Sequence, residues 1–352
     1  MTEVPPPLRR RMSARDPSEE HRAATPLELL FDLCFVVAVA QAAAQLHHGL
    51  AEGHPGPYVL GYLMVFFAIW WAWMNFTWFA SAYDTDDVPY RLLTLVQIAG
   101  VLVLAAGVPD TFHHYDFTLV TVGYVIMRLA MVVQWLRASA EHPETRTITN
   151  RYAVGIAVVQ AGWLLRLLLP ESPGVIGFFV LALAEISVPV WAERGRPTSW
   201  HPGHIAERYG LFTIIVIGEV VLASMNAVQS AIGDTGISGG LLATAGGGLL
   251  LIFGMWWAYF KRPAEEALAL SPESAFRWGY GHFAVFASAA GVGAGLGVAI
   301  DGISGEAPIG PVYEAFCVAV PVAAYLVSLA LVHERVGEGA ATLVRALGAA
   351  AL

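Results

Sequence analysis

The chain has 352 residues, of which 57% are hydrophobic and only 13% are charged. Its apolar residues gather into runs of about twenty, the length that crosses a bilayer as a helix. This composition excludes a water-soluble globular core. The formal net charge of −9 at pH 7 argues against a nucleic-acid partner, whose phosphates attract basic proteins. We therefore predict an all-α integral membrane protein whose partner is the lipid bilayer.

Residues 1–24 are polar, carry several Pro and Arg residues and contain no apolar stretch. A segment of this kind cannot bury enough apolar surface to fold alone. We predict that residues 1–24 form a disordered cytoplasmic arm.

About ten transmembrane helices follow the arm, one for each long apolar run. The runs comprise residues 27–47, 58–80, 91–108, 117–138, 152–170, 174–192, 205–230, 241–260, 279–300 and 313–333. The tail from Gly337 to Leu352 is weakly apolar and short for a crossing. We favour an interfacial helix for this tail over a truncated eleventh span.

Basic residues orient these spans, because Lys and Arg next to a span resist translocation. With a cytoplasmic N-terminus, Arg128 and Arg166 lie within spans and the others of the 19 basic residues fall on cytoplasmic segments. A wrong number of spans would scatter basic residues over both sides. The pattern therefore favours a cytoplasmic N-terminus.

Span one begins with Glu28 and Asp32, which are four residues apart and hence share one helix face. Thr25, Pro26 and Glu28 match a capping box with proline at the first helical position, which gives Glu28 a structural explanation. Asp32 lies a turn deeper, where an ionisable group needs a partner or water. Asp32 is therefore the stronger functional candidate of the two.

Span two contains an aromatic cluster that includes Trp71 and Trp73. Aromatic residues near helix ends usually lie at the membrane interface, although a cluster of Trp faces also suits a cation or an apolar chain. The run Asp84-Thr85-Asp86-Asp87 follows directly. These aspartates are compatible with magnesium and a diphosphate, with a proton donor as in some terpenoid cyclases, or with a solvated helix-ending turn.

Further charges lie deep within the later spans. They are Arg128 in span four, Arg166 in span five, Glu185 in span six and Glu219 near the middle of span seven, whereas His204, Glu207 and Arg208 open span seven. An intramembrane charge is costly unless it is paired, protonated or solvated. These residues therefore either pair to hold the bundle together or line a path for substrate or protons.

An internal repeat relates the start of the chain to its later part. The segment VFFAIWWAW at Val65 resembles LIFGMWWAY at Leu251, and Glu28 at the start of span one corresponds to Glu207 at the start of span seven. A repeat of six helices is even, so both halves cross the membrane in the same direction. We predict a first half of six helices over residues 25–198 and a second half of four helices plus the tail over residues 199–352.

Span nine contains a row of glycines at alternate positions: Gly291, Gly293, Gly295 and Gly297. They form overlapping G-x-x-x-G pairs, and such small faces let helices pack closely. Two copies of the chain could form a homodimer by packing span nine against span nine along these glycines.

Three segments of this sequence resemble the bacterial low temperature requirement protein A family: TPLELLFDLCFVVAVAQ, WWAWMNFTWFASAYDTDDVPYRLLTLVQIAGVLVLAAGVP and HIAERYGLFTIIVIGEVVLA. The likeness extends over nearly the whole chain from Thr25. The family is associated with growth at low temperature, and the resemblance implies a multi-pass protein of the bacterial cytoplasmic membrane but little chemistry. Residues that match its motifs are Glu28, Phe31, Asp32, Trp71, Asp84, Asp86, Asp87, Arg91, His204, Glu207, Arg208 and Glu219.

Two functions from different classes fit these residues. The first is a transporter or a small-molecule or ion-binding protein whose site lies between the halves. Its candidate ligands are Glu28, Asp32, Trp71, Trp73, Arg128, Glu185, His204, Glu207, Arg208 and Glu219. The alternative is an intramembrane enzyme acting on an isoprenoid or lipid, with Asp84, Asp86 and Asp87 as catalytic residues and Mg as its cofactor. A structural or sensory protein with all deep charges paired is a third possibility.

Overall fold

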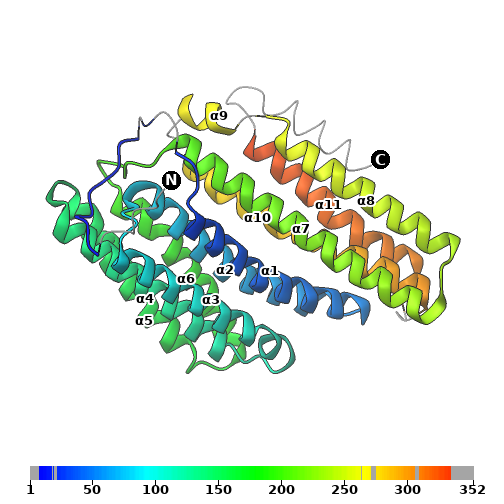
Figure 1. Cartoon of the computed structure of the whole chain (residues 1–352). Coiled ribbons are helices and arrows are strands. Elements are labelled where there is room, and N and C mark those ends of the chain that lie inside the picture. Colours follow the sequence, from blue (N-terminus) through cyan, green and yellow to red (C-terminus); the bar gives the residue numbers. More distant parts are fainter. Residues whose placement is uncertain are drawn as a thin grey trace. The chain divides into compact units, whose positions relative to one another are not determined.

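A computed structural model of the chain describes residues 8–17, 19, 22–262, 264–270, 275–305 and 309–333. These residues form helices and connecting loops, with no strand among them (Figure 1). The elements are α1 (Pro26–Ala51), α2 (Pro55–Tyr83), α3 (Val88–His113), α4 (Thr118–Glu141), η1 (Pro143–Thr145), α5 (Arg146–Arg166), α6 (Glu171–Ala192), α7 (Pro202–Thr235), α8 (Gly239–Phe260), α9 (Ala264–Leu270), α10 (Ala275–Ser304) and α11 (Pro311–Val332). The tail from Gly337, with its predicted interfacial helix, lies outside the described residues.

Each predicted span coincides with one long helix, and nine of the described helices are long and apolar enough to cross a membrane. The exception is α5, whose 21 residues include Arg146, Arg151 and Gln160. It packs between α4 and α6, both of which meet the length and apolarity of a span. The prediction of a polytopic all-helical membrane protein is confirmed, while the side of the N-terminus remains a prediction.

Local sequence explains where several helices begin. Glu28 accepts a hydrogen bond from the backbone N–H of Thr25 at 2.8 Å, and Thr25 Oγ1 accepts one from the backbone N–H of Glu28 at 3.3 Å. This exchange confirms the predicted capping box at the start of α1. Asp87 caps α3 by accepting from the backbone N–H of Tyr90, and Ser238 caps α8 by accepting from that of Leu241.

The helices form two compact units. The first unit comprises Met1–Ala38 and Phe67–Arg208, and the second comprises Val39–Phe66 and Tyr209–Leu352. In the first unit, α3, α4, α5 and α6 each pack against the next in chain order. The crossing of α3 and α4 depends on glycine, because a Cβ on Gly123 would overlap the backbone of Gly100 and Leu104.

In the second unit, α10 packs along α11, and the two helices lie side by side (Figure 1). A Cβ on Gly295 would overlap the backbone of Cys317, so this glycine sets their closest approach. Gly291, Gly293 and Gly297 likewise face side chains of the same unit. The glycine row therefore packs within the chain, and a homodimer through it remains a prediction.

Candidate functional site

Four ionisable side chains meet at the beginnings of α1 and α7: Glu28, Asp32, His204 and Arg208. All four are completely buried, with 0% of each residue exposed. We call them the acid–base cluster. The cluster joins two helices whose contacting residues are about half the chain apart in sequence.

Arg208 lies at the centre of the acid–base cluster. Its Nη2 and Nε donate to the two oxygens of Asp32 at 2.5 and 3.0 Å, and its Nη1 donates to Glu28 Oε1 at 2.8 Å. The Asp32 pair is bidentate, which fixes the guanidinium plane. One guanidinium therefore binds both carboxylates of span one.

Both carboxylates also have side-chain partners besides Arg208. His204 Nε2 lies 3.1 Å from Glu28 Oε1, and Trp73 Nε1 donates to Asp32 Oδ1 at 2.7 Å. Trp73 belongs to α2, so this third helix contributes a donor to the cluster from outside it. The indole N–H helps to fix the position of Asp32, and it adds no charge to the cluster.

Arg22 and Asp84 lie beside the acid–base cluster. Arg22 donates to the backbone oxygens of Ala80 and Ser81 at the end of α2, and its Nη2 lies 3.9 Å from Asp84 Oδ2. Burial, with the negative charge of Glu28, raises the pKa of Asp84 to about 6 despite its arginine neighbours. A second, weaker acid–base pair therefore borders the cluster.

Glu185 forms a separate buried cluster in the first unit. Its carboxylate accepts hydrogen bonds from five side chains of α2, α4 and α5 at 2.8 to 3.3 Å. The donors are Trp71, Tyr124, Arg128, Gln160 and Trp163. We call this set the Glu185 cluster, and its two opposite charges balance.

Arg128 keeps unused donors inside the Glu185 cluster. Its Nη2 binds Glu185, whereas its Nε and Nη1 are buried and have no hydrogen-bond partner among the described residues. The Oε1 atom of Gln160 is also buried and unpaired there. Such groups are normally satisfied by ordered water or a ligand.

The three aspartates of the acidic run are each engaged by arginine. Asp87 accepts two hydrogen bonds from Arg137 at 2.6 and 2.8 Å, and Asp86 accepts two from Arg91 at 2.7 and 2.9 Å. Asp84 has a side chain that is 4% exposed and lies 3.7 Å from Arg15.

Hydrogen bonding explains the strong acidity of Asp87. Burial opposes its ionisation, but the bonds from Arg137 and from the backbone N–H groups of Arg10 and Tyr90 outweigh burial and lower the pKa to about 2. The described residues contain no group of three or more His, Cys, Asp and Glu side chains placed to hold a metal ion. The acidic run is therefore arranged as an arginine-binding turn in this structure.

The aspartates and Glu141 anchor the arm that precedes α1. The backbone N–H of Arg10 donates to Asp87 at 2.8 Å, and that of Met12 donates to Glu141 at 2.6 Å. Further along, the backbone N–H of Arg15 donates to the oxygen of Ala82 at 2.9 Å. The polar composition of residues 1–24 gave no sign of these contacts.

The last two predicted site residues lie outside both clusters. Glu207 is exposed and accepts from the backbone N–H of Ala24 at 3.1 Å. Glu219 is half-buried in α7 in the second unit. Of the predicted residues, the structure thus gathers Glu28, Asp32, Trp73, His204 and Arg208 in one place and Trp71, Arg128 and Glu185 in another.

Sequence reasoning missed three of the four neutral donors of the Glu185 cluster, namely Tyr124, Gln160 and Trp163. Tyr124 and Arg128 are four residues apart on α4, so they share one helix face that points at Glu185. Gln160 and Trp163 have the matching three-residue spacing on α5. A polar residue and an aromatic at helical spacing, within spans that also carry a charge, were the available signal.

These features define a polytopic helical membrane protein with two buried ionic clusters among its helices. The chain belongs to the bacterial low temperature requirement A family, since the model described as "Bacterial low temperature requirement A protein (LtrA)" matches residues 23–352. The resemblance drawn from its motifs is confirmed. An uncharacterized protein of Rhizobium meliloti (strain 1021) is 28% identical over 293 residues, which are 77% of this chain and 68% of that protein. No solved structure matches the chain.

Proposed function

We propose that this protein is a proton-coupled transporter of a small solute in the bacterial cytoplasmic membrane, and that the acid–base cluster is its proton-binding site. The observation that carries the proposal is the charge balance of that cluster. Glu28 and Asp32 supply two negative charges, whereas Arg208 supplies one positive charge. With a neutral imidazole, the cluster has a net charge of −1.

A net charge that is completely buried is costly. A proton on His204 removes this charge, because Nε2 of the imidazolium lies within hydrogen-bond distance of Glu28. Histidine is also the side chain whose ordinary pKa is nearest to neutral pH. The cluster is therefore suited to gain and lose one proton.

The groups around the cluster leave this balance unchanged. Trp73 of α2 and Tyr90 of α3 are neutral, and above the pKa of Asp84, which is about 6, the charge of Arg22 is matched by the Asp84 carboxylate that follows α2. The Glu185 cluster, by contrast, holds one acid and one arginine. Support for proton exchange therefore belongs to the acid–base cluster rather than to the Glu185 cluster.

The place of the cluster in the chain supports coupling to transport. Glu28 and Asp32 open the first predicted half, and His204 and Arg208 open the second. Transporters built from repeats place their sites where the halves meet. A proton that changes the contact between α1 and α7 would therefore change the contact between the halves.

Proton binding is tested by infrared spectroscopy of the full chain in nanodiscs with isotope-labelled histidine. We expect the wild-type protein to take up a proton on His204 as the pH falls. His204→Gln should remove this signal. His114→Gln is the matched control, because the His114 side chain is 72% exposed. Uptake that is identical in wild type and His204→Gln would contradict the proposal.

Transport is tested in proteoliposomes that contain a trapped pH-sensitive dye. The probes are Na⁺, K⁺ and defined amino acid mixtures. Each probe is added first on the side of the vesicle membrane with the higher proton concentration and then, in a separate experiment, on the opposite side. We expect one probe to move protons in the wild type and in Asp86→Asn, and none to do so in Asp32→Asn. Proton movement that survives in both Asp32→Asn and His204→Gln would argue against this site.

A further inference from the structure

A cavity of about 400 Å³ lies in the second unit among α1, α2, α10 and α11. Each helix contributes residues at helical spacing, so one face of every helix lines it. The deep lining includes Leu46, Tyr62, Ala287 and Gly291, and Tyr62 is only 3% exposed. The acid–base cluster belongs to the other unit, so this cavity is independent of the proposed function.

Small side chains and a proline create the space. A Cβ on Gly291 would lie 3.4 Å from Cβ of Pro321 and 4.0 Å from Cδ2 of Leu46, so the missing side chain leaves room. Ala284 and Ala287 precede Gly291 on the same face of α10. Pro321, inside α11, also lacks the backbone N–H that would bond to the preceding turn. The residues that leave this space therefore belong to two adjacent helices, α10 and α11.

Three side chains of the lining carry a hydroxyl, and two of these hydroxyls are already engaged; the third, that of Tyr313 at the start of α11, has no hydrogen-bond partner among the described residues. The hydroxyl of Tyr62 donates to the backbone oxygen of Ala287 at 2.6 Å, and that of Ser288 donates to the oxygen of Ala284 at 2.5 Å. Neither hydroxyl has its proton available for an incoming ligand. The lining therefore suits hydrocarbon better than a polar head group.

The mouth of the cavity faces outward from the helices. Leu63, Phe316 and Val320 line it and are 40%, 61% and 60% exposed. On membrane-spanning helices, exposed apolar side chains contact the acyl chains of the bilayer. The molecules that reach this mouth are therefore lipids.

We propose that this cavity binds one acyl chain of a bilayer phospholipid, which enters from the hydrocarbon region past Leu63 and Phe316. The volume falls within the range of small-molecule pockets. The chain occupies the space that Gly291 and Pro321 leave, and the head group remains outside the cavity. The site is a hydrocarbon-binding site on the lipid-facing side of the second unit.

The test is photo-crosslinking of full-length protein in nanodiscs that contain a phospholipid with a diazirine near the end of one acyl chain. Mass spectrometry locates the adducts. We expect adducts on the deep lining around Leu46, Ala287 and Pro321 in the wild-type protein. Ala284→Phe should block the mouth and reduce these adducts about tenfold, which equals about 1.4 kcal/mol.

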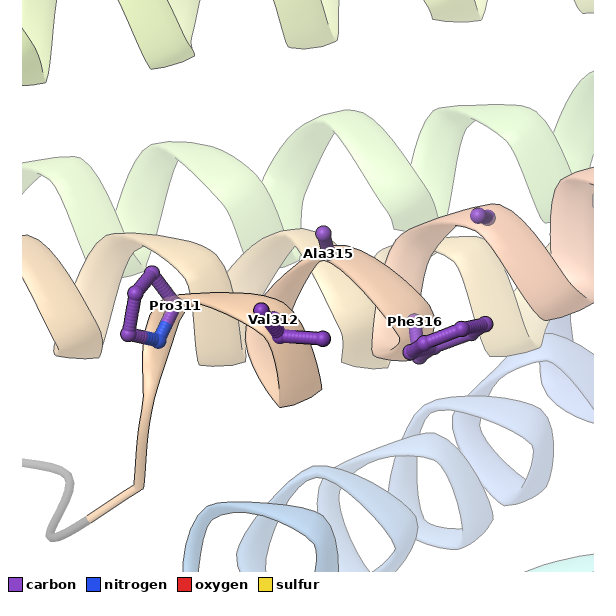
Figure 2. A pocket seen from close by; sticks show the side chains of 5 residues that line it. Pro311, Val312, Ala315 and Phe316 are labelled. Carbon is purple, nitrogen blue, oxygen red and sulfur yellow. The ribbon is translucent and has the colours of Figure 1, made fainter. Parts of the chain in front are cut away.

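Ala315→Phe provides the matched control. Figure 2 shows Ala315 in a shallow hollow along α11, together with Pro311, Val312 and Phe316. Ala284 and Ala315 are both exposed, so the same substitution adds the same bulk at each without disturbing a buried core. Ala315 does not line the cavity, and its variant should keep the adducts of the wild type.

Three results would overturn the proposal. The first is a set of adducts confined to the exposed faces of α10 and α11, with none on the deep lining. The second is deep labelling that Ala284→Phe and Ala315→Phe reduce equally. The third is deep labelling by a diazirine-bearing polyprenyl chain but not by the phospholipid probe, which would assign the cavity to an isoprenoid instead.

Discussion

At the scale of single residues, the two ionic clusters differ in how completely they are neutralised. Glu185 is matched by Arg128 and by four neutral donors, whereas Glu28 and Asp32 share the single guanidinium of Arg208. A buried pair of opposite charges holds its helices together, because removing either charge leaves the other uncompensated and destabilises the fold. An unbalanced set can instead exchange a proton.

We expect Glu185→Gln to destabilise the protein by about 3–5 kcal/mol, because it leaves the Arg128 charge buried without a counter-charge. The shape of the side chain is kept, so packing changes little. The double variant Arg128→Met with Glu185→Leu should recover most of this loss, since a well-packed apolar pair avoids desolvating charge. Thermal unfolding in detergent measures both. Equal stability of wild type and Glu185→Gln would show that the Arg128–Glu185 ion pair does not hold these helices together.

The raised pKa of Asp84 predicts a pH dependence of stability. Its pKa is about 6 in the folded protein, above the ordinary value of 3.8, so the folded state binds the proton more tightly than the unfolded state. Stability from this group therefore increases as the pH falls from about 6 towards 4, and is lost as the pH rises through about 6.

Asp84→Asn should remove this part of the pH profile of the midpoint of thermal unfolding. Asp86→Asn is the control, because the Asp86 side chain is 42% exposed and lies in the same turn. If both variants keep the wild-type slope between about pH 6 and 4, burial of Asp84 does not govern it.

At the scale of elements, the arm is held against the end of α4. Glu141 accepts hydrogen bonds from Arg9 at 2.8 Å and from the backbone of Met12 at 2.6 Å, and it also contacts Arg137 at 3.3 Å. The carboxylate thereby links the arm to the end of α4. Loss of its charge should release the arm while leaving the helices intact.

We expect Glu141→Gln to speed cleavage by trypsin within the run Arg9, Arg10 and Arg11, because the arm then spends more time detached from α4. Glu144→Gln is the matched control, since the Glu144 side chain is 77% exposed and lies three residues further along. Gel analysis of limited digests compares the rates. An unchanged rate in Glu141→Gln would show that backbone contacts alone hold the arm.

Sequence patterns predicted the elements better than the contacts between them. Helix existence follows from apolar runs, and the start of α1 follows from Thr25, Pro26 and Glu28, which are adjacent in the chain. The pairing of Asp32 with Arg208 joins residues 176 positions apart. No local pattern encodes such a distance, so only the three-dimensional packing reveals which acid meets which base.

At the scale of the whole molecule, α5 decides the topology. Among the helices that the structure describes, it is the long one that falls short of the apolarity of a span, and a cytoplasmic N-terminus places basic residues consistently only if it crosses. If α5 does not cross, every later connection changes sides. Its two flanking loops therefore test the orientation of the whole chain.

We expect a membrane-impermeant maleimide added to intact cells to label Glu171→Cys but not Glu144→Cys, in a background without Cys34 and Cys317. Both positions are exposed in loops or helix ends that flank α5. Glu144→Cys should react after the cells are opened. Labelling of both positions from outside, or of neither, would show that α5 does not cross.

The link between α1 and α7 also sets an order for biogenesis. As the chain inserts during synthesis, Glu28 and Asp32 enter the bilayer with the first helix, long before Arg208 has been made. Until α7 arrives, these two acids have no guanidinium and must stay hydrated or protonated. Nascent chains that stop before His204 therefore carry both acids without the guanidinium that binds them in the folded protein.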